Sequence, residues 1–274
     1  MTSQSTIAGQ EKFESPTFLN RLKSMLKLDF YRLFHTPAFY IMLLFAAIIP
    51  AMVLGMSGME PPAVTNTHSV SAAPSAPAIA YTNTWQLIES AGGSAAADNP
   101  MDFSGYANIN MLFIFAGLLI SIFVSHDYSS GFVKNIFAVH SKKTDYVLSK
   151  SAVGLFSGAG MIITYVLGTV LSGWLAGKSF DVNGGGLILC LISKLFLMGV
   201  FCPLFLGVAV FFRNRLWLTI VFTFLLGMMF YPAASAASLN ATVITVLMSF
   251  IAGAGGAAAF GSVSNLILKR RDLA

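Results

Sequence analysis

Long hydrophobic runs without charge dominate the pattern of this chain. They occupy residues 33–59, 103–126, 151–177 and 216–268, and residues 182–212 are interrupted only by Lys194. A helix rises about 1.5 Å per residue and the hydrocarbon core of a bilayer is about 30 Å thick, so uncharged runs of this length are typical of membrane spans. The pattern therefore predicts an all-α integral membrane protein.

We expect six transmembrane helices. Their predicted boundaries are 38–57, 105–125, 151–176, 187–212, 216–232 and 242–268. The last two divide one uncharged run, because Tyr231-Pro232 and the Ala/Ser/Asn-rich stretch that follows mark a break. The fifth span is short, and part of 233–241 is expected to dip back into the membrane where protein covers its backbone.

Residues 17–36 combine a hydrophobic face with a basic face. The apolar positions recur at helical spacing and are Leu19, Leu22, Leu26, Phe30, Leu33 and Phe34. Between them lie Arg21, Lys23, Lys27 and Arg32. This pattern predicts an amphipathic helix in the membrane interface, the alternative being a solvated helix that packs on a soluble partner. The polar residues 1–16 before it are expected to be a disordered tail.

The basic residues predict the orientation of the chain. Of its 16 Lys and Arg residues, 14 lie before the first span, in 126–150, at 213–215 or at 269–271. The positive-inside rule then places both termini and the segment 126–150 in the cytoplasm. The same rule explains the net charge of +5 without a nucleic-acid partner. The external segment 58–103, rich in Ala, Ser and Pro, is expected to be loosely structured.

Composition and missing chemistry narrow the function. The chain is 56% hydrophobic and only 10% charged, too little charge to cover a soluble domain of this size. No Asp or Glu falls inside a predicted span, which argues against an ion-driven carrier and a membrane hydrolase. Residues 172–179 resemble a phosphate-binding loop, but Ser172 replaces its first glycine and the segment is predicted to be external. No catalytic residue, metal site or cofactor is expected.

Two further features of the predicted spans concern packing and charge. Lys194 is the one charge within a span, and we expect its ammonium group to snorkel to the outer interface rather than to contact an anionic substrate. Small residues at four-residue spacing predict close helix packing. They are Gly154/Gly158 and Gly253/Ala257/Gly261.

The segment 126–150 carries the candidate interaction site. It leaves the second span with Asp127-Tyr128 and continues through Gly131, Lys134 and Asn135 before a basic stretch reaches the third span. A short amphipathic helix that presents charges and aromatic residues to the cytoplasm suits a socket on another protein. An ordinary interfacial loop that satisfies the positive-inside rule is the alternative.

With these residues, the chain resembles the permeases of ABC-2-type exporters. The likeness rests on the basic helix before six spans, on the approach Leu28-Asp29-Phe30-Tyr31-Arg32-Leu33-Phe34, and on 127–135 followed by Lys142-Lys143, Tyr146 and Lys150. Within that family the chain looks most similar to the small stand-alone permeases of peptide-antibiotic (lantibiotic) export and immunity systems.

The resemblance implies a dimer of permease subunits, identical or homologous, in a bacterial cytoplasmic membrane, driven by separate ABC ATPase subunits. It makes 126–140 the coupling helix that contacts the ATPase, and its candidate residues are Asp127, Tyr128, Gly131, Lys134 and Asn135. The absence of acids from the spans, together with 24 phenylalanines, predicts an amphiphilic substrate such as a peptide, lipid or hydrophobic drug. The alternative function is an ATP-independent membrane scaffold or immunity protein that binds a peptide or other membrane proteins.

Overall fold

The computed structural model describes residues 17–57, 83–88, 108–138, 142–181, 184–213, 215–235 and 237–270. The predicted tail 1–16 and most of the predicted external segment 58–103 lie outside these residues. All regular secondary structure in the described residues is helical, apart from one isolated β-bridge between Asn83 and Ser179. The helices are α1 (Phe18–Phe34), α2 (Pro37–Ser57), the 3-10 helix η1 (Thr84–Leu87), α4 (Met111–Ser129), α5 (Phe132–Ala138), α6 (Lys143–Leu175), α7 (Gly184–Phe212), α8 (Leu216–Met229), α9 (Tyr231–Ser235) and α10 (Val243–Arg270). The all-α prediction is confirmed.

Five of the described helices, α2, α4, α6, α7 and α10, are long and apolar enough to cross a membrane. The chain is therefore a multi-pass membrane protein. The fifth predicted span, 216–232, corresponds to a shorter apolar helix, α8, whose 14 residues extend about 21 Å, followed by the five-residue α9.

Three predicted boundaries differ from the helix ends by four residues or more. Helix α4 begins at Met111 instead of 105 and continues to Ser129 instead of ending at 125, and α6 begins at Lys143 instead of 151. Both helices therefore carry acidic residues, Asp127 and Asp145, which the predicted spans excluded. The helices extend past these charges because other charged side chains of the protein pair with them.

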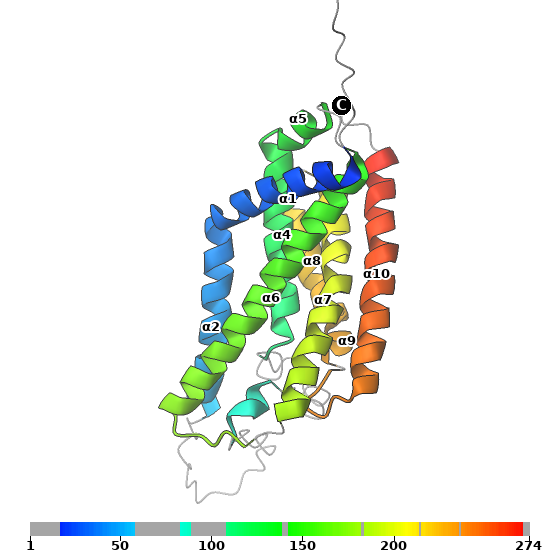
Figure 1. Cartoon of the computed structure of the whole chain (residues 1–274). Helices are drawn as coiled ribbons and strands as arrows, with labels where there is room; N and C mark the ends of the chain where they lie inside the picture. The colour runs from blue at the N-terminus through cyan, green and yellow to red at the C-terminus, as the bar shows by residue number, and fades with distance from the viewer. Residues whose placement is uncertain are drawn as a thin grey trace, which may run out of the picture.

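The long helices lie side by side, and α1 lies across the end of the bundle at which α10 finishes (Figure 1). Helix α7 packs against α4, α6, α8 and α10, and α2 packs against α6. Small residues allow these close approaches, as expected. Gly158 faces the Met198 side chain, and an added Cβ at Gly253 would collide with the carbonyl oxygen of Phe196. Gly261, by contrast, faces open space.

The described part of the segment predicted to be external is packed, not loose. In η1 and the residue after it, Thr84, Leu87 and Ile88 are buried. The Tyr165 hydroxyl donates to the Leu87 carbonyl at 2.9 Å, and the Trp85 indole N–H donates to the Phe180 carbonyl at 3.1 Å. Two apolar side chains and these hydrogen bonds anchor 83–88 against α6, so the expectation of loose structure is wrong for these six residues.

Lys194 does not snorkel. Its side chain is 1% exposed, and its ammonium group donates to Asn110 Oδ1 at 2.6 Å and to the Ala234 carbonyl at 3.2 Å. Asn110 is the N-cap of α4 and Ala234 belongs to α9. Because these two helix ends meet α7 inside the bundle, oxygen acceptors are available there without a path to water.

Candidate functional site

One face of α1 buries a charged side chain, that of Asp29, against the rest of the protein. Met25, Asp29 and Leu33 recur at four-residue spacing and are the buried residues of this helix. Residues four apart share a helix face, so Asp29 lies in the middle of the contact that α1 makes with the bundle. Several apolar residues of α1, among them Leu19 and Tyr31, are exposed instead. The helix thus docks through a stripe centred on a carboxylate.

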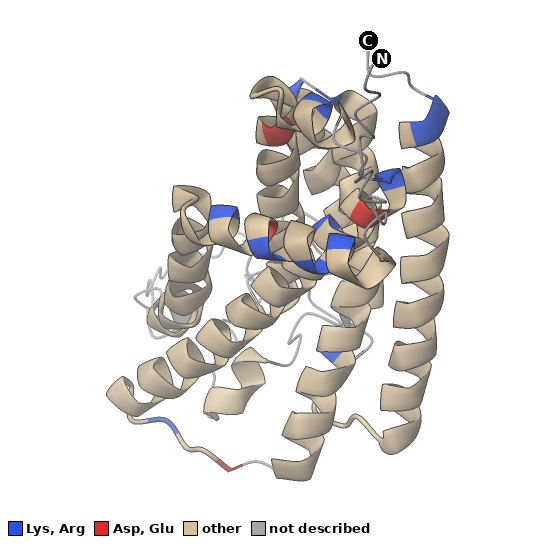
Figure 2. Cartoon of the chain, turned by 45° about the horizontal axis from the view of Figure 1, so that its top comes forward, with Lys and Arg blue, Asp and Glu red and all other residues tan. Residues whose placement is uncertain are grey.

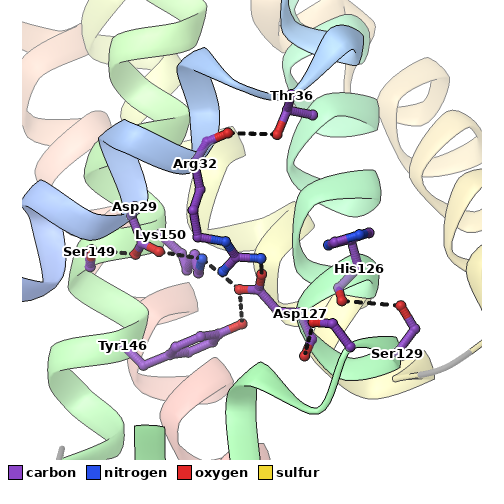
Figure 3. Close-up of polar contacts among 10 residues, drawn as sticks. Asp29, Arg32, Thr36, His126, Asp127, Ser129, Tyr146, Ser149 and Lys150 are labelled. Atoms are coloured by element: carbon purple, nitrogen blue, oxygen red, sulfur yellow. Dashed lines mark hydrogen bonds and ion pairs between the residues drawn. The ribbon is translucent and has the colours of Figure 1, made fainter. Parts of the chain in front are cut away.

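The buried carboxylate belongs to a network of charges shown in Figure 3. The Lys150 ammonium nitrogen lies 2.7 Å from Asp29 Oδ1 and 2.5 Å from Asp127 Oδ2. Arg32 Nη2 lies 2.5 Å from Asp127 Oδ1. Two cations thus face two anions from three helices, α1, α4 and α6, and the formal charge of the group is zero.

Hydrogen bonds complete this group. The Ser149 hydroxyl donates to Asp29 Oδ2 at 2.6 Å, and the Tyr146 hydroxyl donates to Asp127 Oδ2 at 3.2 Å. Buried charges are tolerated when they are paired and hydrogen-bonded in this way. We call the six residues the buried network; they are Asp29, Arg32, Asp127, Tyr146, Ser149 and Lys150.

Two aromatic rings cover the cations of the buried network. The Arg32 guanidinium carbon lies 3.8 Å from the centre of the Phe132 ring, and the Lys150 ammonium lies 4.1 Å from the centre of the Phe123 ring. These distances are typical of cation–π contacts. Phe132 is the first residue of α5, so the short helix touches the network directly.

Gly131 sets the direction in which α5 leaves α4. Its φ is +70°, a left-handed conformation that favours glycine, and its N–H donates to the Tyr128 carbonyl at 3.3 Å. An added Cβ at Gly131 would meet nothing within 4 Å. The need for glycine within this chain is therefore conformational, and the turn it makes brings Phe132 back over Arg32.

Helix α5 has two distinct faces. Val133 is buried, and the Phe137 ring packs edge-on against the ring of Tyr146 with centroids 5.7 Å apart. Lys134 and Asn135 are exposed on the other side. The helix joins the network residue Tyr146 on one face and offers a cation and an amide on the other.

The five residues predicted to contact an ATPase divide between these two environments. Asp127 is 0% exposed, so the expectation that its carboxylate faces a partner protein is wrong: Arg32 and Lys150 hold it inside. Tyr128 is half-buried and packs against the core. Lys134 and Asn135 face outward, and Gly131 forms the turn between the two groups.

The sequence did not predict that Asp127 and its partners form a buried cluster. Asp29, Tyr146 and Lys150 stood out only as points of likeness to a family, Arg32 also as part of the basic face of 17–36, and Ser149 not at all. A signal was present in α1: Asp29 lies four residues from both Met25 and Leu33, on the stripe that the bundle buries. A charge on the apolar stripe of a helix indicates a buried partner of opposite charge.

The described residues provide no group of three or more His, Cys, Asp or Glu that could hold a metal ion. The acids at this end are held by cations, which suits a mechanical joint between helices better than acid–base chemistry. The site therefore joins three helix ends to a short helix with a free outer face.

Comparison with known families agrees with this arrangement. The family described as "ABC-2 family transporter protein" matches residues 25–230, about three-quarters of the chain, including the buried network and α5. The comparisons with curated proteins and with solved structures gave no match. From the extent of the family match, the chain belongs to the ABC-2 family of membrane transport subunits.

Proposed function

We propose that this chain is the permease of an ABC-type exporter that moves an amphiphilic substrate outward with ATP hydrolysed by a separate subunit. Membership of the ABC-2 family supports the transport role. The observation that carries the coupling role is the two-faced α5. Its Lys134 and Asn135 are exposed, while Phe132 and Phe137 contact the buried network.

In this proposal the exposed face of α5 docks on the ATPase and the other face transmits the movement. A displacement of α5 acts on α1 through the Phe132–Arg32 contact and on α6 through the Phe137–Tyr146 contact. The ion pairs of Asp127 and Lys150 hold the ends of α1, α4 and α6 together. Separating paired buried charges is costly, so the three ends move as one body in this proposal.

The proposal includes six membrane crossings with the basic end in the cytoplasm. Helix α1 and the end of α10 lie at the same end of the bundle, where Lys and Arg gather on both (Figure 2). A chain whose first and last helices meet at one end crosses an even number of times, so the five long helices need a sixth crossing. Helices α8 and α9 supply it, and the positive-inside rule makes the basic end cytoplasmic.

Dimerisation and substrate class rest on the outer faces of the bundle. Helix α10 buries little of its surface in this chain and exposes large apolar side chains such as Ile244, Leu247 and Ile251. A path between two copies lined by such faces favours amphiphiles, including antibiotic-like peptides, over ions and sugars. We place this assembly in a bacterial cytoplasmic membrane.

The test of coupling compares two charge reversals at the same end of the molecule. Lys134→Glu changes the outer face of α5, and Lys27→Glu changes an exposed lysine of α1 that is outside the buried network. We expect both variants to be expressed and folded like the wild type. Lys134→Glu should lower the amount of ATPase that co-purifies in mild detergent at least about tenfold, the loss expected for a charge at the centre of an interface.

Retention of the ATPase by Lys134→Glu would remove α5 from the docking surface. If the wild-type chain co-purified with no subunit that carries a nucleotide-binding motif, the exporter proposal would fail, and the ATP-independent scaffold would replace it.

A further inference from the structure

A hydrophobic groove opens between α7, α8 and α10. Its volume is about 330 Å³. The floor is formed by Pro203, Leu204 and Gly207 of α7, and the walls include Phe222 of α8 and Phe260 and Ile267 of α10. The close packing of α10 on α7, where the Ser264 hydroxyl donates to the Pro203 carbonyl at 3.2 Å, fixes the groove from behind.

The groove has the length of one membrane leaflet. Its lining residues run from Pro203 to Phe212, the last residue of α7, and from Phe260 to Ile267 on α10. The nine residue steps on α7 extend about 14 Å, close to half of a hydrocarbon core of about 30 Å. Its dimensions suit an acyl chain of the leaflet at the basic end, and so does its lining, which is apolar except for Ser264.

Cations flank the mouth of this groove. Arg215 follows three residues after the lining residue Phe212, and Lys269 and Arg270 follow directly after Ile267 and Leu268. All three side chains are exposed, and none forms an ion pair with a described residue. The three described acids of this end are occupied elsewhere: Asp29 and Asp127 in the buried network and Asp145 by Arg21 at 3.0 Å.

We infer that this groove binds an anionic glycerophospholipid, with one acyl chain between α8 and α10 and the phosphate at Arg215, Lys269 and Arg270. Basic pockets between membrane helices are suited to anionic headgroups, and the apolar groove supplies the chain contact that a free phosphate lacks. Lys143 strengthens the site by donating from its ammonium group to the Leu268 carbonyl at 2.8 Å, which holds the end of α10 in place.

A second groove serves as an internal control. It lies between α6 and α7, has a similar volume of about 290 Å³, and is lined by apolar residues that include Ile163, Leu167 and Ile192. It lies away from the helix ends that carry the cations. Acyl chains are therefore expected there without selection for the headgroup.

The experiment measures retained lipid by native mass spectrometry of the purified full chain. Phosphatidylglycerol and phosphatidylcholine of identical acyl composition are offered in equal amounts. The wild type should retain phosphatidylglycerol at least about tenfold over phosphatidylcholine, and the triple variant Arg215→Glu/Lys269→Glu/Arg270→Glu should lose this preference. Reversal of Lys23 and Lys27, exposed cations of α1, should leave the preference intact.

A second pair of variants tests the groove without a change of charge. Val263→Trp fills it from a side chain that is 50% exposed, and Ile163→Trp fills the control groove from one that is 62% exposed. Only Val263→Trp should lower phosphatidylglycerol retention. The inference is overturned if neither the triple variant nor Val263→Trp changes lipid retention. It is also overturned if glycerol phosphate competes as well as the lipid does, or if Val263→Trp changes only the oligomeric state.

Discussion

This molecule contains two buried polar clusters at different depths, and they compensate their buried charges in different ways. The buried network at the basic end pairs Arg32 and Lys150 with two carboxylates. The second cluster holds Lys194 with the Asn110 side chain and the Ala234 carbonyl, and no acid among the described residues pairs with it. One cluster is neutral by ion pairing, whereas the other leaves a cation solvated by neutral oxygens.

This difference assigns the clusters different mechanical roles. Removing one charge from a neutral buried group leaves its partner uncompensated, which is costly, so the buried network resists any separation of α1, α4 and α6. The Lys194 ammonium has already lost its hydration on burial, so exchanging one neutral oxygen acceptor for another changes the free energy little. We therefore expect the contact of α9 with α7 to be the weaker joint.

The largest effect is expected for Asp127→Asn. This change leaves Arg32 and Lys150 opposite a single carboxylate, Asp29, and should reduce the free energy of unfolding by about 3 to 5 kcal/mol. The measurement is denaturation in mixed micelles, followed by tryptophan fluorescence. Asp181→Asn, at an exposed acid of the loop after α6, is the matched control and should cost under about 0.5 kcal/mol. Equal losses for the two variants would show that the network does not hold the helices together.

A smaller but more specific effect is the coupling between partners. Lys150→Met removes the second charge of the pair, so Asp127→Asn/Lys150→Met leaves Asp29 and Arg32, one charge of each sign. The double variant should lose at least about 1 kcal/mol less than the sum of the two single variants. Strict additivity in the same denaturation measurement would mean that the two side chains act independently despite their 2.5 Å separation.

The sequence predicted the uncharged helices and the basic helix α1, but it misplaced the charged ends of α4 and α6. Helices α2, α7 and α10 begin and end within a few residues of their predictions, because uncharged runs delimit them. The ends of α4 and α6 were misplaced because charged residues such as Asp127 and Lys150 normally indicate a segment exposed to water. Lys150 is paired with Asp29, 121 residues away, and Asp127 is paired with Arg32 of the same distant helix, and a local pattern cannot register such partners. The same holds for Lys194, whose acceptors lie 84 and 40 residues away.

The turn into α5 gives an intermediate effect. Gly131→Ala places a Cβ in a left-handed conformation and should cost about 1 to 2 kcal/mol, while Gly131→Asn should cost less because asparagine tolerates this conformation. Gly255→Ala, at a helical glycine of α10 that also faces open space, should be neutral or stabilising by up to about 1 kcal/mol. Thermal unfolding in detergent ranks the three variants. If alanine and asparagine cost the same at 131, conformation is not the reason for the glycine.

The smallest effect is expected at Lys194, and it tests the comparison most directly. Lys194→Met removes a buried cation, which relieves its desolvation cost, but it also leaves Asn110 Oδ1 and the Ala234 carbonyl without their donor. These contributions oppose each other, so the net change in the free energy of unfolding should stay within about 1 kcal/mol. Lys194→Met/Asn110→Leu removes the side-chain acceptor as well and should be at least as stable as Lys194→Met alone, because an apolar pair replaces a half-satisfied polar one. A loss of 3 kcal/mol or more, about that expected for Asp127→Asn, would show that Lys194 has an anionic partner and that the two clusters are alike.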